Sequence, residues 1–364
     1  MVGSRVWVGA GVGGNKVMVL VGETGTAGWL AQAASMTNIN ASVSFFIVRD
    51  NLGMGQSYPK IKLETFKPWQ GHEGLWDDGG GYYNSSTMQP TKQPLQIAGR
   101  VMVILALALV FTGWLVTTPP GFLGKLDSVG YAVCHRISER SFHIGSYQLP
   151  LCARCSGMYL GAMLGLAFQA VTSRRKSGMP GWLVIIPLAL FFLAFAVDGG
   201  NSYLYLIKET YPGALASIPN LYIPNNTLRL FTGSGMGLVI SAAIFPAFNQ
   251  TIWKRQDDRP ALVGLQKLAL LVAITLLADL LVLTESPWVL FPLALISAGG
   301  VLVLLTMIYA ILWLMLFKQD NLYERLSQAW LALLAGFTLS LLQVAVVDVL
   351  RFWLTHTWGG FPLG

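Results

Sequence analysis

Long apolar stretches separated by short polar segments dominate the sequence from about residue 97 onward. A helix needs about 20 mostly apolar residues to cross the hydrocarbon core of a bilayer. The stretches that meet this requirement lie near residues 101–117, 152–171, 182–198, 228–248, 265–283, 288–316 and 329–354. The pattern therefore predicts an all-α fold, a polytopic transmembrane helical bundle of about seven helices.

Residues 1–96 do not share this pattern. They contain many glycines and polar residues, no sustained period of 2 or 3.6, and no apolar run of 18 residues. We expect a poorly structured N-terminal extension that is either disordered or lies ahead of the true start of translation, near Met88. The alternative is a soluble extension of unknown role. The transmembrane domain is expected to cover residues 97–364.

The composition supports a membrane protein and argues against a nucleic-acid partner. Hydrophobic residues make up 54% of the chain and charged residues 11%, and the mean hydropathy is +0.57, outside the range of soluble domains. The net charge of +7 comes from Lys and Arg residues scattered through short loops, without a basic stripe. The predicted partner is the lipid bilayer, and the sequence does not identify any protein partner.

The positive charges also predict the orientation of the bundle. The leader ahead of the first span and the loops after the second, fourth and sixth spans contain Lys92, Arg100, Arg174, Arg175, Lys176, Lys254, Arg255, Arg259, Lys318 and Arg325. By the positive-inside rule this face is cytoplasmic. We therefore expect a cytoplasmic N-terminus and an extracytoplasmic loop between the first two spans.

All three cysteines, Cys134, Cys152 and Cys155, lie within 22 residues of each other in that loop and at the entrance of the second span. Cys152 and Cys155 share one helix face, so two thiolates can hold one metal ion while Cys134 folds back as a third ligand. His135 or His143 would complete the tetrahedral Cys3His shell that zinc prefers. The spacing predicts a zinc site, structural if closed in this way and catalytic if water takes the fourth position.

Other interpretations of the cysteines remain open. A CxxC pair at a helix N-terminus beside Arg154 is also typical of a membrane thiol–disulfide oxidoreductase, with Cys134 as the resolving partner. A structural disulfide or three inert buried cysteines would fit the same residues. A c-type haem is disfavoured because Ser156 follows Cys155, where attachment needs histidine.

Further polar residues are predicted to gather on the same side of the membrane. These residues are Arg136, Glu139, Arg140, Arg154, Asp198, Asn226 and Arg229. The third span is expected to end at Asp198 and the fourth to begin at Asn226, so topology alone brings Asp198 and Arg229 to the cysteine loop. We expect these two residues to form an ion pair, either as a clamp between helices or with a function. Glu139 and His135 are candidates for an acid and base pair at a metal.

Ionisable residues within the later spans suggest a third function class. Asp279 has no obvious partner in its own helix and is a candidate proton relay, whereas Asp348 and Arg351 are spaced to face each other on one helix. A small-solute or proton transporter would use Asp279 with Asp198 and Arg229. Against this class, the two halves of the chain show no convincing internal repeat.

Small residues predict how the second span packs. Gly157, Gly161 and Gly165 recur at every fourth position. Such a small-xxx-small face allows a neighbouring helix to approach closely.

The cysteine loop also resembles a known family. The pattern Cys134-His-Arg-x-x-Glu139-Arg-Ser-Phe, then Pro150-x-Cys152-Ala-Arg-Cys155-x-Gly157-x-x-x-Gly161, is similar to the signature of the uncharacterised prokaryotic membrane proteins called domain of unknown function 2085. The resemblance extends to Asp198-Gly199 and to Asn226-x-x-Arg229-x-x-Thr232-Gly233, and covers about residues 120–250. It implies a multi-pass domain in a bacterial or archaeal plasma membrane. The family has no established activity, so no catalytic residue is assigned.

Overall fold

The computed structural model describes residues 6–12, 15–21, 93–211, 213, 215 and 217–359. The chain divides into two compact units, Met1–Ser85 and Ser86–Gly364. In the first unit, strands β1 (Val6–Val12) and β2 (Asn15–Val21) pair antiparallel. The sequence analysis did not predict this hairpin. The other expectations for residues 1–92, including a start near Met88, lie outside the described residues.

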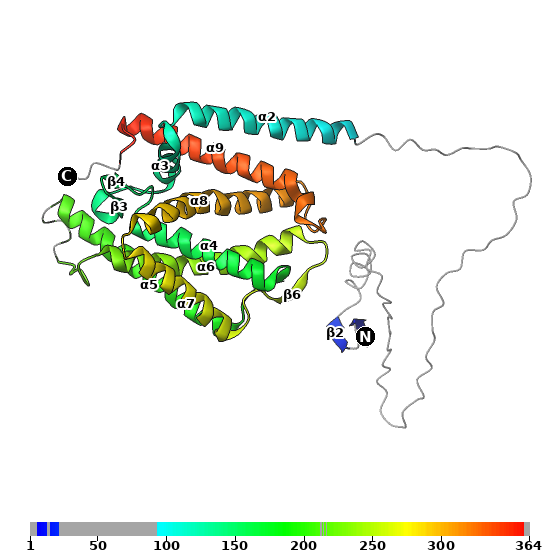
Figure 1. Ribbon diagram of the computed structural model, residues 1–364. Helices are drawn as coiled ribbons and strands as arrows, with labels where there is room; N and C mark the ends of the chain where they lie inside the picture. The colour runs from blue at the N-terminus through cyan, green and yellow to red at the C-terminus, as the bar shows by residue number, and fades with distance from the viewer. Residues whose placement is uncertain are drawn as a thin grey trace, which may run out of the picture. The chain divides into compact units, whose positions relative to one another are not determined.

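The second unit is a bundle of helices (Figure 1). Its helices are α2 (Gln93–Thr117), α3 (Gly121–Val133), α4 (Ala153–Ser173), α5 (Trp182–Thr210), α6 (Asn226–Ile252), α7 (Gly264–Val282), α8 (Pro287–Leu316) and α9 (Trp330–Thr355). Within the described part of the chain, 7 helical segments are long and apolar enough to cross a membrane. Each overlaps one of the predicted stretches, so the prediction of about seven membrane-spanning helices is confirmed.

The outer surface of the bundle suits a lipid environment. Large apolar side chains remain exposed on the helices, among them Leu109 at 76% and Trp288 at 90%. A soluble protein rarely exposes so much contiguous apolar surface. The chain is therefore a multi-pass membrane protein whose surroundings are the bilayer.

Short elements cap the two ends of the bundle. The 3-10 helix η1 (Ser138–Arg140) and the antiparallel hairpin of β3 (His143–Ile144) and β4 (Tyr147–Gln148) lie between α3 and α4. At the opposite end, β5 (Lys176–Gly178) pairs in parallel with β6 (Asp257–Pro260), and η2 (Leu326–Ala329) precedes α9 (Figure 1). The cysteine loop therefore lies at one end and the basic loops at the other.

Helix α3 is an additional element that the hydrophobic pattern did not reveal. Its 13 residues are too few to cross a bilayer, and Lys125, Asp127 and Ser128 interrupt the apolar run. Its last two turns are buried, and a Cβ added at Gly130 would lie 1.9 Å from the carbonyl oxygen of Pro150. This close approach fixes the end of α3 against the segment that leads into α4.

Helix α5 is longer than predicted. The expectation that the third span ends at Asp198 is wrong, because the helix continues to Thr210. Two glycines after Asp198 weaken a helix by only about 1 kcal/mol each, and contacts beyond them offset this cost. Asn201 donates to the carbonyl oxygen of Tyr222 at 2.9 Å and accepts from the amide of Leu221 at 2.9 Å. Asp198 consequently projects from within a helix.

Helices α4 and α6 make a very close contact at the centre of the bundle. A Cβ added at Gly157, Gly161 or Gly165 would lie 2.4, 2.2 or 2.0 Å from an atom of α6. On the other side, Gly233 and Gly237 face the backbone of α4, at 2.1 and 2.2 Å. Small residues on both helices let the two backbones approach, which is how helices associate without a hydrophobic driving force.

We expect Gly161→Val to destabilise the bundle by about 1–3 kcal/mol, because the new side chain overlaps the backbone at Ser234. Thermal unfolding in detergent measures the change. Gly299→Val is the matched control, since nothing lies within 4 Å of a Cβ at Gly299. An equal loss in both variants would show that helix contact is not the cause.

Candidate metal centre

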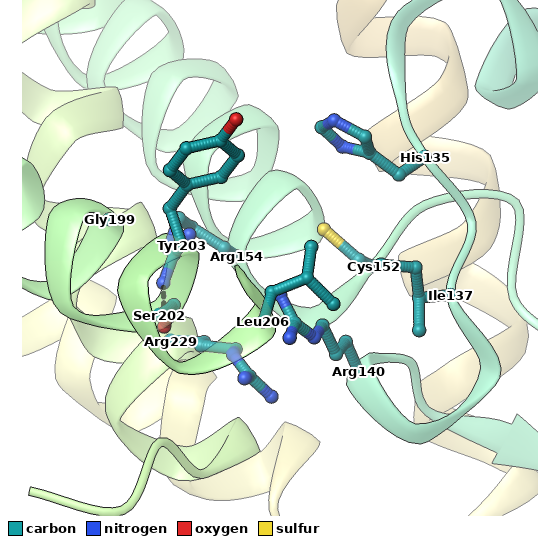
Figure 2. Close-up of a pocket in the computed structure, with 10 residues that line it drawn as sticks. All are labelled: His135, Ile137, Arg140, Cys152, Arg154, Gly199, Ser202, Tyr203, Leu206 and Arg229. Carbon is teal, nitrogen blue, oxygen red and sulfur yellow. Dashed lines mark hydrogen bonds between the residues drawn. The ribbon is translucent and has the colours of Figure 1, made fainter. Parts of the chain in front are cut away.

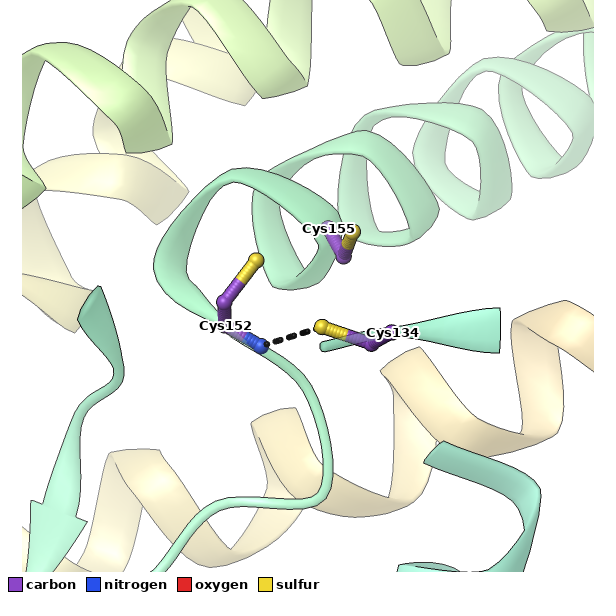
Figure 3. A group of neighbouring side chains, drawn as sticks. All are labelled: Cys134, Cys152 and Cys155. Atoms are coloured by element: carbon purple, nitrogen blue, oxygen red, sulfur yellow. Dashed lines mark hydrogen bonds between the residues drawn. The ribbon is translucent and has the colours of Figure 1, made fainter. Parts of the chain in front are cut away.

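The three cysteines converge from two elements. Cys134 directly follows α3, Cys152 immediately precedes α4, and Cys155 lies in the first turn of α4. Their sulfur atoms all lie within 4.8 Å of one another, and all three residues are free thiols (Figure 3). The backbone amide of Cys152 also donates to the sulfur of Cys134 at 3.3 Å. The structure thus brings together the three predicted sulfur ligands.

The thiols of the cluster differ in how readily they lose a proton. Hydrogen bonds from the Cys152 and Cys155 thiols hold the pKa of Cys134 well below its ordinary value. The interaction with Cys134 is also the main reason that the pKa of Cys152 rises to about 11. Three thiolates this close would repel one another, so a divalent cation is the natural means of deprotonating all three.

The spacing of the sulfurs is close to that of a metal site. Three sulfurs bound to zinc at about 2.3 Å in tetrahedral geometry lie about 3.8 Å apart. Separations of 4.8 Å or less therefore need to shorten by about 1 Å at most.

The two candidate histidines lie outside this group of sulfur atoms. His143 begins β3, and its Nε2 atom is 3.1 Å from the Ser138 hydroxyl. His135 follows Cys134 and lines a pocket together with Cys152 (Figure 2). A histidine as the fourth ligand remains a prediction, and it would require one of these rings to move toward the sulfurs.

The backbone around Cys134 is held by residues from distant parts of the chain. Arg136 has a left-handed backbone with a φ of 54°, and its Nη2 atom donates to Asp127 Oδ1 at 2.9 Å. Arg351 was expected to face Asp348 on its own helix, but it reaches across to donate to the carbonyl oxygens of Tyr131 and Cys134. A cation at the C-terminal end of α3 satisfies carbonyl groups that the helix leaves without partners.

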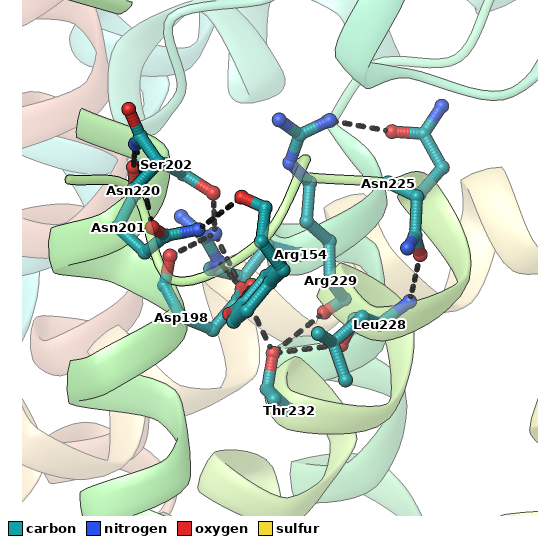
Figure 4. A network of polar contacts seen from close by, with 11 residues as sticks. Arg154, Asp198, Asn201, Ser202, Asn220, Asn225, Leu228, Arg229 and Thr232 are labelled. Carbon is teal, nitrogen blue, oxygen red and sulfur yellow. Dashed lines mark hydrogen bonds and ion pairs between the residues drawn. The ribbon is translucent and has the colours of Figure 1, made fainter. Parts of the chain in front are cut away.

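Asp198 is the centre of a second polar network (Figure 4). The Nε atom of Arg154 donates to Asp198 Oδ2 at 2.9 Å, and the Tyr222 hydroxyl donates to Oδ1 at 2.8 Å. Within the described residues Asp198 forms an ion pair with Arg154 and not with Arg229, so the predicted pair is wrong. Because α5 continues past Asp198, this carboxylate pairs with Arg154 in the first turn of α4, and on α6 it accepts from the Thr232 hydroxyl at 3.1 Å.

Arg229 forms its hydrogen bond with a residue of its own helix. Its Nη1 atom donates to Asn226 Oδ1 at 2.9 Å, and Asn226 donates to the backbone carbonyl of Glu139 at 3.2 Å. The Glu139 side chain is exposed, and its role with His135 as an acid and base pair stays a prediction. Asn226 therefore links the start of α6 to η1.

Asp279 has a partner that the sequence could not reveal. It is 1% exposed on α7, and the Ser234 hydroxyl of α6 donates to its Oδ1 atom at 2.7 Å. The two residues are 45 positions apart. A serine on the seam between α4 and α6 thus anchors the carboxylate proposed as a proton relay.

A pocket of about 430 Å³ opens beside the cysteines (Figure 2). Its lining comes from the cysteine loop and from α4, α5 and α6, and comprises His135, Ile137, Arg140, Cys152, Arg154, Gly199, Ser202, Tyr203, Leu206 and Arg229. Sequence reasoning singled out the charged members of this set. It missed Ser202 and Tyr203, because α5 was expected to end before them.

Comparisons with known proteins agree with the resemblance noted in the sequence. Residues 134–243 match the family described as Predicted membrane protein (DUF2085). An uncharacterised protein of Methanocaldococcus jannaschii is 29% identical over 132 residues, which cover 36% of this chain and 72% of that protein. An uncharacterised protein of Methanothermobacter thermautotrophicus is 27% identical over 110 residues, which cover 30% of this chain and 82% of that protein. No solved structure matches the chain. The matched region contains the cysteines, Asp198 and Arg229.

Proposed function

We propose that this multi-pass membrane protein binds one zinc ion through Cys134, Cys152 and Cys155, and that the metal fastens the end of α3 to the start of α4. The observation that carries the proposal is the convergence of the three sulfurs within 4.8 Å from separate elements. Soft thiolate ligands in tetrahedral geometry favour zinc.

The fourth ligand in this proposal is His135. It adjoins Cys134 in sequence and lines the same pocket as Cys152, whereas the His143 ring is engaged with Ser138. Three cysteines and one histidine form a closed structural site. With water in place of His135, the same ion would face the pocket as a Lewis acid.

The proposal also places the cysteine end of the bundle outside the cytoplasm. The opposite end contains the loops that follow α4, α6 and α8, and these loops include Arg174, Lys254 and Arg325. Positive charge in short loops retains them on the cytoplasmic side. Reaction of Cys134→Ser, whose remaining thiols are released from metal, with a membrane-impermeant maleimide on intact cells tests this orientation.

Elemental mass spectrometry on the full chain purified in detergent tests the metal proposal. We expect about one equivalent of zinc per chain and its loss in the triple variant with serine at the three cysteine positions. If the ring is a ligand, His135→Ala should weaken zinc binding by more than the about 10- to 100-fold that loss of an outer-shell partner costs, and His143→Ala serves as the matched control.

A free-thiol count on the same samples separates the rival interpretation. No metal, with two thiols protected until a reductant is added, would overturn the proposal and favour a disulfide or a thiol–disulfide oxidoreductase. A transporter that uses Asp279 would instead show flux that survives replacement of all three cysteines.

A further inference from the structure

The pocket beside the cysteines contains more positive charge than the protein neutralises. Arg140 of η1, Arg154 of α4 and Arg229 of α6 all line it. Among these three, within the described residues, Arg154 alone forms an ion pair, with Asp198. No carboxylate is among the lining residues, and the exposed Glu139 and Glu209 form no ion pair with Arg140. The positive charges of Arg140 and Arg229 therefore face the cavity.

Hydrogen-bond donors of these two arginines lack partners. Arg229 is 6% exposed, and its buried Nε atom has no hydrogen-bond acceptor. The half-buried Arg140 side chain makes no hydrogen bond within the described residues. Burying guanidinium donors without acceptors is costly, and an anion in the cavity would offset this cost by accepting from the Arg229 Nε atom and from Arg140.

The net charge at the pocket stays positive when the proposed metal ion is included. Three arginines carry a charge of +3, Asp198 contributes −1, and zinc with three thiolates contributes −1. The sum over these groups is about +1 with the metal, and about +1 or +2 without it, depending on whether Cys134 is a thiolate or a thiol. An anion is therefore attracted in either state, so the inference does not depend on the zinc proposal.

We propose that this pocket binds a phosphate group. The planar guanidinium groups of Arg140 and Arg229 match the paired oxygens of a phosphate, to which arginine binds in a bidentate manner. Ser202 already accepts from Arg154 at 2.8 Å, so its hydroxyl proton is available to a phosphate oxygen. The volume of about 430 Å³ exceeds that of a phosphate alone.

The remaining walls accommodate the rest of the phosphate-bearing molecule. Ile137 and Leu206 provide apolar surface, and Tyr203, 65% exposed on α5, lies at the pocket (Figure 2). The phosphate comes either from a lipid headgroup or from a soluble phosphate compound. Both sources present the same oxygens to the arginines, and two binding measurements distinguish them.

The first measurement is equilibrium dialysis of the full chain in a neutral maltoside detergent with radiolabelled inorganic phosphate. The second is native mass spectrometry with added phosphatidic acid, compared with diacylglycerol, which has the same tails and no phosphate. Saturable binding in the first assay supports the proposal with a soluble ligand. Binding only of phosphatidic acid supports it with a lipid, and binding of neither overturns it.

Substitutions of pocket residues test whether phosphate binds in this pocket. Arg140→Gln should weaken phosphate binding about 10- to 100-fold, the effect of losing charged hydrogen bonds, and Arg140→Lys should restore part of it. The matched control is Arg259→Gln, an exposed arginine on β6 that pairs with Asp257. Equal losses in Arg140→Gln and Arg259→Gln would overturn the proposal. Zinc content measured on each sample separates a failure of this pocket from a failure of the metal site.

Discussion

Removing the proposed zinc ion with a strong chelator is expected to destabilise the cysteine end of the bundle by about 3 kcal/mol and to expose all three thiols. Cys134 and Cys152 are 18 residues apart, and a cross-link that closes a loop of this size stabilises a protein by about that amount. Thermal unfolding in detergent and the rate of reaction with a maleimide fluorophore measure the two effects. Both should reverse when zinc is added back.

Cys134→Ser provides the control for this experiment. Its remaining thiols should react at once, and the chelator should not change its unfolding temperature further. If the chelator changed neither the rate of thiol reaction nor the unfolding temperature of the wild-type protein, no metal would join α3 to α4.

Asp198→Ala is expected to lower the free energy of unfolding by about 3–5 kcal/mol. Asp198 is 1% exposed and the Arg154 side chain 19%, so the substitution leaves a largely buried guanidinium group without its counterion. It also removes the acceptor of the Tyr222 and Thr232 hydroxyls, which lie at 2.8 and 3.1 Å. Unfolding by titration with a denaturing detergent measures the loss.

The surface pair of Asp257 and Arg259 is the matched control. Both side chains are accessible, at 32% and 76%, so Asp257→Ala should change the free energy of unfolding much less than Asp198→Ala. The double variant Arg154→Met with Asp198→Leu should recover much of the loss, because it removes both charges together. Equal losses at Asp198 and Asp257, or no recovery in the double variant, would contradict the role assigned to the buried pair.

The sequence by itself determined the seven spans and much of the site's membership. A span is recognised from its own apolar length, since the thickness of the bilayer sets the number of residues required. Cys134, Cys152 and Cys155 lie within one short loop, so their proximity is also a nearly local property. The four-residue spacing of Gly157, Gly161 and Gly165 marked the face of α4 on which α6 packs.

The tertiary structure alone decided which charged groups meet. Asp198 forms its ion pair with Arg154 and not with Arg229. Asp279 accepts a hydrogen bond from the uncharged Ser234, and Arg351 donates to a carbonyl oxygen at the end of α3. These choices depend on how deep each helix lies and how it is rotated about its axis, and packing between distant segments sets both quantities. Because α5 continues to Thr210, Asp198 lies inside the helix and not at its end. The residues of α5 that follow Asp198 form one wall of the pocket. Hydropathy along the chain carries no information about such rotations, because it averages over all faces of a helix.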